Sequence, residues 1–530
     1  MRTSGMDAAE AANVPPSKSS TVVSTNRTFV DLSKSAKKLD RRLHSSSKCQ
    51  TALVRNPQPY QEDLAVSFFL KYITRVARSV HSTRGCLEFV GPVLTTQRTG
   101  SVLYAAVTAA ANRLWRRLRP DSISSSQSIE DVQRALKRLQ TATDDPKERG
   151  GDATVIAILI LQWHDTLTAV HDRHKARGTH RNGAKTLLSR DDNVGDAARH
   201  RANLRGNVFH NQVSLCIKQK TALQADDIEW LQTRVMGALP ANPASVLDLV
   251  GVDVAKLQHG LHRLLMKGME QETSGLGGLS DMAANAAVHL RAWLEVLPTS
   301  WHPRRLHRGI DFNSSIDAYE DASDVYPSIQ IANIWNQWYI YSLIVAIVQS
   351  QLAKNEASTL QQMENIKKLV YCICCSVPYY VGNPTRPVSY SDIEDGSQII
   401  FPSFHDLQPT DEAYPEYLVS DHYASRVDHD RHVMLQGPLH IMSVLSHVIG
   451  MLADGPRSRG AIMLEQGQEE WLQRQLMRSL YLTRIVSLDQ SKSGGSPVHG
   501  SVCERGGDGK PRATALASWI RQNLWTMNVL

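Results

Sequence analysis

The amino-acid sequence predicts an all-α protein, a large bundle-like body built from many helices. Several long stretches repeat apolar residues at the spacing of one helix face, as Met363, Ile366, Val370 and Ile373 do. No series of alternating strands bounded by hairpin turns is evident, which argues against α/β and all-β folds. At 530 residues the chain exceeds the size at which one hydrophobic core stops growing, so we expect two or more helical subdomains.

The predicted helices follow one another along the chain and carry apolar faces or apolar runs. Ser128 and Asp131 have the spacing of a capping box, which predicts a helix start at that point. The runs 155–161 and 338–348 are shorter than the roughly 20 residues that cross a bilayer, so we interpret them as buried core helices and expect no membrane partner. The clearest predicted helices are 62–80, 101–119, 128–139, 153–172, 331–353, 439–452 and 469–486.

The composition divides the chain into a body and two different ends. Residues 1–58 are rich in Ser, Thr, Lys, Arg and Pro, which predicts a disordered basic arm. We expect the helical region to run through a first half, 59–300, and a second half, 301–489. Residues 490–512 are rich in Gly and Ser and predict a flexible linker. The short apolar tail 513–530 could dock on the body or on a partner, and its sequence does not decide which.

The charge pattern argues against a dedicated nucleic-acid binder. A net charge of +7 is modest for this length, and a 42% hydrophobic content excludes a wholly disordered chain. Two basic pairs, Lys37 with Lys38 and Arg41 with Arg42, form a candidate nuclear-import signal; a solvated charge run is the alternative. The arginines between 113 and 119 end a predicted helix, where cations complement the helix dipole, so capping explains them better than DNA contact.

The cysteines indicate neither disulfides nor a metal site. Seven of them are scattered along the chain and no secretory signal precedes them, which favours a reducing compartment, the cytosol or the nucleus. Cys372, Cys374 and Cys375 lie among apolar residues on a predicted helix, so we interpret them as buried side chains. The sequence gives no reason to expect a cofactor.

The densest polar cluster is SDHYASRVDHDRHV, at 420–433, and it is the most enzyme-like feature of the chain. It lacks a helical HExxH pattern, and the chain has no phosphate-binding loop, nucleophile elbow or kinase signature. We therefore assign no catalytic or metal-binding residue and expect no enzyme. The alternative is an all-helical metal-dependent enzyme or a ligand-binding protein. Its candidate ligands are Asp421, His422, Asp428, His429, Asp430 and His432.

Three segments resemble the regulatory region of the fungal zinc binuclear cluster (six-cysteine) transcription factors, over about residues 60–486. The first is a long apolar helix followed by GTHRNGAKTLLSR, the second is CICCSVPYYVGNP, and the third is GPLHIMSVL. Their order and separations also resemble the family. The matching positions are His180, Gly183, Ala184, Leu187 and Leu188; Ser376, Val377, Pro378, Tyr379 and Gly382; and Gly437, Pro438 and Leu439.

In physical terms these matching positions have scaffold roles. Gly183 and Ala184 would allow close helix packing, Pro378 would end one helix, and Gly382 would turn the chain. In the family, a glycine at the place of Gly437 precedes a helix that starts at Pro-Leu.

The resemblance implies a nuclear regulator of transcription for a fungal metabolic pathway, including secondary-metabolite biosynthesis. It further implies DNA and the transcription machinery or co-regulators as partners, with a homodimer as an option. The sequence departs from the family in lacking the zinc cluster, since Cys49 is alone among the first 85 residues. DNA contact would then come from a partner protein, or from a zinc cluster missing from an incomplete gene sequence. A pure interaction scaffold is a third alternative.

Overall fold

The computed structural model describes residues 58–75, 86–119, 125–172, 179–189, 196–237, 242–267, 273–395, 398–407, 425–454, 464–486 and 512–523. These residues belong to one compact unit, Gln58–Leu530, and they form an all-α body with one short hairpin, which confirms the predicted fold class. The predicted basic arm and the predicted linker lie outside the described residues, apart from residue 58 and the first residue of the last helix.

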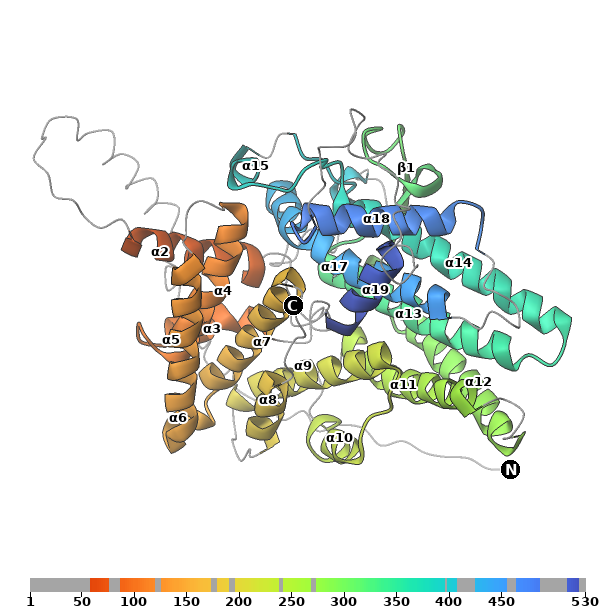
Figure 1. Ribbon diagram of the computed structural model, residues 1–530, viewed down its shortest axis with the longest axis horizontal. Helices are drawn as coiled ribbons and strands as arrows, with labels where there is room; N and C mark the ends of the chain where they lie inside the picture. Colours follow the sequence, from red (N-terminus) through yellow and green to blue (C-terminus); the bar gives the residue numbers. More distant parts are fainter. Residues whose placement is uncertain are drawn as a thin grey trace, which may run out of the picture. The chain divides into compact units, whose positions relative to one another are not determined.

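The helices follow the chain in the order shown in Figure 1. They are α2 (Gln58–Phe69), α3 (Val90–Thr95), α4 (Val102–Leu118), α5 (Ser125–Asp144), α6 (Pro146–Arg149), α7 (Asp152–Asp172), α8 (Thr179–Ser189), α9 (Asp196–Gln219), α10 (Ala225–Trp230), α11 (Pro243–Lys267), α12 (Thr273–Glu295), α13 (Ile329–Leu352), α14 (Glu356–Val381), α15 (Tyr390–Asp395), α17 (Arg426–Asp454), α18 (Gln468–Leu482) and α19 (Arg512–Asn523).

Helix α4 organises the N-terminal part of the body by packing against α2, α5 and α7 (Figure 1). The Ser101 hydroxyl caps α4 by accepting the backbone N–H of Tyr104. The sequence-based capping box is wrong, because α5 begins at Ser125 and Ser128 lies within it. The Asp131 carboxylate instead accepts a buried 2.7 Å hydrogen bond from Asn112 of α4, which joins the two helices.

Helices α13, α14 and α17 pack against one another and form the centre of the second part of the body. The α13 helix also contacts α11 and α12, so the predicted boundary at residue 300 does not separate two compact units. By length and composition α7, α13 and α17 could each cross a membrane, but 83%, 83% and 100% of their most apolar windows are buried within the protein. The prediction that 155–161 and 338–348 belong to buried core helices is confirmed.

The two strands form an antiparallel hairpin that the sequence did not predict. Strand β1 (Arg304–His307) pairs with β2 (Ala322–Val325), and β2 packs on α14. The Arg305 guanidinium donates two hydrogen bonds, of 2.5 and 2.9 Å, to the carboxylate of Asp324 on the neighbouring strand. This pair lets the carboxylate of Asp324, which is 3% exposed, lie between the hairpin and the helices.

The C-terminal tail docks on the body, which resolves the question that its sequence left open. Helix α19 packs against α17 and α18, and both Ala517 and Ile520 are fully buried. Ala517 and Ile520, in the described part of this tail, therefore contribute to the core.

Replacing Ile520 by Ala is expected to lower the free energy of unfolding by about 2–4 kcal/mol, because it leaves a cavity between three helices. Urea unfolding of the full chain measures this change. Leu360→Ala, at a side chain that is 63% exposed, is the matched control and should change stability by less than about 0.5 kcal/mol. Equal effects of the two variants would contradict the docking of α19.

Candidate functional site

The second and third family-like segments meet at one helix crossing. Gly437 of α17 lies against the backbone of Tyr380 in α14, so closely that a Cβ atom at position 437 would overlap the Tyr380 carbonyl oxygen. Tyr380 is fully buried, and its hydroxyl donates a 2.9 Å hydrogen bond to the Asn333 side chain of α13. Only glycine permits this approach of two helix backbones.

The turn after α14 also needs glycine. Gly382 has φ +56° and ψ −144°, in a region that residues with a Cβ rarely adopt, and a Cβ there would overlap the carbonyl of Ile400. Its N–H donates a 2.8 Å hydrogen bond to the carbonyl of Pro378. The chain turns at Gly382, as predicted.

Both prolines of these segments lie inside helices, which corrects two expectations. Pro378 does not end α14, which continues to Val381, and the segment at Pro438 does not start a helix, because α17 begins at Arg426. A proline inside a helix removes one backbone hydrogen bond but lets the chain continue when surrounding contacts hold the helix. Sequence reasoning missed this because both residues are almost fully buried, in contacts that no local pattern encodes.

The first family-like segment lies on α7 and α8. Ala184 and Leu188 are fully buried, and Ala184 therefore fits the expected close packing. Gly183 does not, since a Cβ at that position would meet no atom within 4 Å. His180, in the first turn of α8, lines a cleft between α4, α5, α7 and α8.

This cleft has a volume of about 650 Å³, within the range of small-molecule sites. Its lining combines aliphatic side chains from α5 and α7 with polar side chains from all four helices. The aliphatic residues are Ile129, Val132, Leu136 and Leu161, and the polar residues are Arg113, Arg116, Ser128, Gln133, His164, Asp165, Thr168, Asp172, Thr179 and His180. Two arginines at the end of α4, Arg113 and Arg116, therefore line a cleft, which their interpretation as helix-dipole caps did not predict.

Most charges in the cleft have a partner. Arg113 lies 3.5 Å from the carboxylate of Asp172, and the negative charge of Asp165 acts on His180. Burial lowers the pKa of His180, and the Asp165 charge opposes that shift. Burial and the Arg113 charge lower the pKa of His164 to about 4, so this imidazole is neutral at pH 7.

Acid is expected to destabilise the protein through His164. The unfolded chain takes up a proton near pH 6.5 and the folded chain only near pH 4, so stability is complete above pH 6.5 and falls as the pH drops toward 4. The loss from this group is about 3 kcal/mol.

Urea unfolding at pH 7 and pH 4.5 of the His164→Gln variant tests this expectation. The variant should lose about 2–3 kcal/mol less than the wild-type chain over this range, because glutamine does not titrate. His307→Gln, at an exposed histidine, is the control and should follow the wild type. A wild-type pH dependence in the His164 variant would contradict the neutral buried imidazole.

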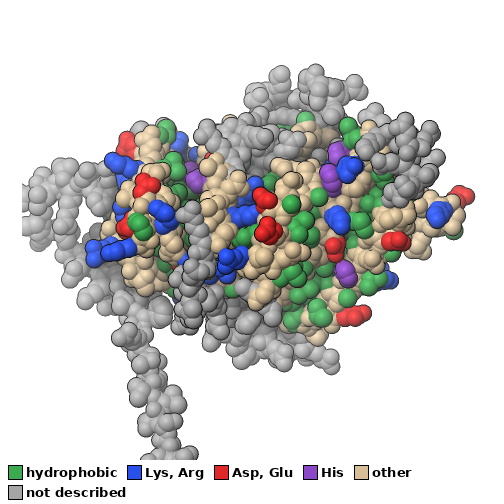
Figure 2. Space-filling view, turned by 90° about the horizontal axis from the view of Figure 1, so that it is seen from below, with side chains coloured by type: hydrophobic (Ala, Val, Ile, Leu, Met, Phe, Trp, Pro, Cys, Tyr) green, Lys and Arg blue, Asp and Glu red, His purple; other side chains and the backbone are tan. Residues whose placement is uncertain are grey.

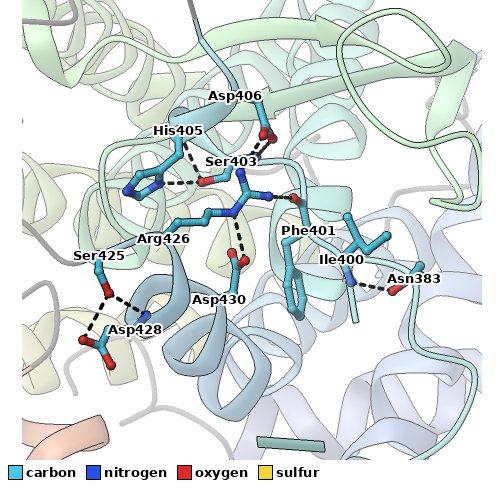
Figure 3. A network of polar contacts seen from close by, with 10 residues as sticks. All are labelled: Asn383, Ile400, Phe401, Ser403, His405, Asp406, Ser425, Arg426, Asp428 and Asp430. Atoms are coloured by element: carbon cyan, nitrogen blue, oxygen red, sulfur yellow. Dashed lines mark hydrogen bonds and ion pairs between the residues drawn. The ribbon is translucent and has the colours of Figure 1, made fainter. Parts of the chain in front are cut away.

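The polar cluster at the start of α17 forms separate structural contacts (Figure 3). Arg426 binds the carboxylates of Asp406, at 2.5 Å, and Asp430, at 2.8 Å, and donates a 3.0 Å bond to the carbonyl of Phe401. The Asp428 carboxylate lies 3.5 Å from Lys71. These contacts hold the first turn of α17 against the segment that contains Phe401 and Asp406. They also hold it against the π-helical turn Leu70–Arg75, which follows α2.

The histidines of that cluster point into separate surroundings. His432 donates a 2.7 Å hydrogen bond from Nδ1 to the carbonyl of Tyr72, whereas the His429 ring lies beside Tyr379 and His405. Burial lowers the pKa of His429 well below 6.5. Asp421 and His422 lie outside the described residues. The described members of the cluster therefore hold the fold together and do not converge on one point.

Of the three cysteines on α14, Cys374 and Cys375 are buried as predicted, whereas Cys372 is only partly buried. Cys374 and Cys375 are fully buried, and burial raises the pKa of the Cys375 thiol to about 12. Such thiols remain protonated at neutral pH and do not act as ligands or nucleophiles. Within the described ranges, no group of three His, Cys, Asp or Glu side chains is placed to hold a metal ion.

A buried polar seam between α9, α11, α13 and α17 was missed by sequence reasoning. His210 contacts Asp248 at 2.6 Å, and Gln337 donates a 3.0 Å hydrogen bond to the same carboxylate. Lys218, which is 6% exposed, donates a 2.9 Å hydrogen bond to the hydroxyl of Ser443. Burial lowers the pKa of Lys218 to about 7. The polar residues within otherwise apolar helices were the signal that could have revealed it.

Comparison with protein-family models, with curated proteins and with solved structures finds no match to this chain. The fold and its cleft define the chain as an all-helical protein with a cavity of small-molecule size.

Proposed function

We propose that this chain is a nuclear regulator of fungal transcription that acts through its all-helical body. The observation that carries the proposal is the ordered set of three segments that resemble the regulatory region of the six-cysteine transcription factors. A metabolic pathway, including secondary-metabolite biosynthesis, is the proposed target, because that is the usual role of the family that the segments resemble.

The positions of these segments in the fold support the proposal. Gly437 and Tyr380 place the second and third segments in direct contact, and Ala184 buries the first segment in the core. Residues with such roles are the ones that a shared fold would require. Several of the resembling positions, though not Gly183, are thus packing sites of the body, which supports the proposal.

DNA contact is proposed to come from a partner protein or from a zinc cluster missing from an incomplete gene sequence. On the face drawn in Figure 2, the described Lys and Arg side chains are interspersed with Asp and Glu and do not form one basic field. Proteins that bind nucleic acid directly gather basic residues on one face or stripe. The charge distribution on this face therefore gives no sign of a DNA-binding surface there.

Chromatin immunoprecipitation of the tagged full chain in its own organism, together with transcript profiling of a deletion strain, tests the proposal. We expect enrichment at discrete promoters and altered transcript levels of the adjacent genes. A cytosolic protein that occupies no promoter under inducing conditions would refute it. Stable partners without any change in transcripts would instead favour an interaction scaffold.

The candidate import signal offers a sharper test of nuclear action, although it lies outside the described residues. Replacing Lys37, Lys38, Arg41 and Arg42 by Ala should move the protein to the cytosol and abolish promoter occupancy. The matched control replaces four other basic residues of the arm, and it removes the same charge but keeps both basic pairs. These control positions are Arg2, Lys18, Arg27 and Lys48. Equal nuclear accumulation of the two variants would show that the pairs are a solvated charge run.

A further inference from the structure

We infer that the cleft between α4, α5, α7 and α8 binds a small organic acid, a single carboxylate on an apolar carbon skeleton. The inference rests on the geometry of the cleft and does not depend on the chain being a transcription regulator. Its volume of about 650 Å³ suits a compact metabolite and is small for a folded partner.

Among the described cations that line the cleft, Arg116 is the one without an ion-pair partner. Its side chain is half-buried, and within the described part of the chain its guanidinium makes no hydrogen bond or ion pair. The neighbouring Arg113 is already matched by Asp172. A guanidinium without an ion-pair partner at a cleft favours an anionic group of the ligand beside it, and a guanidinium binds a carboxylate through two parallel hydrogen bonds.

Two further polar groups line the cleft without a partner among the described residues. The side chain of His164 is only 7% exposed and its Nε2 atom is buried. The hydroxyl of Thr168 is buried as well. Buried polar atoms are normally hydrogen-bonded, so each such orphan needs an explanation. A ligand oxygen that reached either atom would supply the missing partner, accepting from the Thr168 hydroxyl or from the neutral imidazole.

The apolar part of the lining suits the remainder of the ligand. Ile129, Val132 and Leu136 are spaced i, i+3 and i+7 on α5, so they form one apolar stripe along the cleft. Ile129 is 58% exposed and Leu136 is 43% exposed, which is unusual for large aliphatic side chains beside a cavity. An apolar skeleton lying along this stripe would remove both from water.

Isothermal titration calorimetry with hexanoate, octanoate and decanoate at pH 7.5, using the full chain, tests the inference. We expect one equivalent of octanoate to bind, with affinity rising about fourfold per added methylene until the stripe is covered. Octan-1-ol and octylammonium have the same apolar chain without the negative charge and should bind at least about tenfold more weakly. This comparison needs no variant.

Substitutions then locate the site. Arg116→Met should weaken octanoate binding at least about tenfold and leave octan-1-ol unchanged, whereas Arg116→Lys should retain part of the affinity. Leu136→Ser should reduce the gain per methylene. Arg291→Met, at an exposed arginine of α12, is the matched control and should bind as the wild type does. Binding of none of the three carboxylates, equal binding of octan-1-ol, or wild-type affinity in Arg116→Met would each overturn the inference.

Discussion

Gly437→Ala is expected to lower the free energy of unfolding by about 3 kcal/mol or more, a large fraction of the stability of a typical native protein. The added methyl group would overlap the backbone carbonyl of Tyr380, which belongs to a packed helix and cannot move as a side-chain end could. Relief therefore requires α14 and α17 to separate, with loss of packing along both buried helices. Circular dichroism during urea unfolding measures the change.

The matched control for Gly437→Ala is Gly183→Ala, which makes the same substitution in another helix and another family-like segment. A Cβ at position 183 meets no atom within 4 Å, so alanine should stabilise the protein by about 0.5–1 kcal/mol through its higher helix propensity. The two variants are thus expected to differ in sign. Tolerance of alanine at position 437 would contradict the close crossing of the two helices.

Lys218→Met is expected to raise the free energy of unfolding by about 2 kcal/mol or more at pH 7. The lysine is buried between α9 and α17, where its ammonium loses hydration and donates a 2.9 Å hydrogen bond to the hydroxyl of Ser443. Methionine has a similar length, fills the same space and carries no charge. Burial lowers the pKa of this ammonium, so the charge costs desolvation free energy that methionine does not, and replacing buried charges by apolar side chains often stabilises a protein.

The pH dependence of Lys218→Met distinguishes this cause from improved packing. Lys218 has a pKa of about 7 in the folded chain and 10.5 in the unfolded chain, so between these values only the unfolded chain holds the proton. Stability of the wild type therefore rises with pH in this window, by about 1.4 kcal/mol per pH unit from this group, and the advantage of the variant should shrink between pH 7 and pH 9.

The control for this experiment is Lys256→Met, at an exposed lysine of α11, which should show no such convergence. An advantage of Lys218→Met that stays constant with pH would mean that the lysine is charged in the folded protein, and that packing accounts for the gain.

Sequence reasoning identified parts of the candidate site without assembling them. His180 was singled out by its place in a family-like segment, and the arginines at the end of α4 by their charge. Their meeting in one cleft depends on four helices whose packing has no local signature. The polar cluster near His432 was predicted as a group because its members are close in sequence, yet the helix directs them to different partners, and Tyr72 lies 360 residues away from His432.

By itself, the sequence determined the all-α class and the main core helices, because helix periodicity and apolar runs are local properties of the chain. The glycine turn at Gly382 was also readable, since a left-handed backbone conformation favours one residue type. Only the tertiary structure decided the continuation of helices through Pro378 and Pro438, the docking of α19 and the pairing of Lys218 with Ser443, 225 residues apart. These features depend on contacts between distant segments, and such contacts override local preferences when the packing free energy exceeds the local cost.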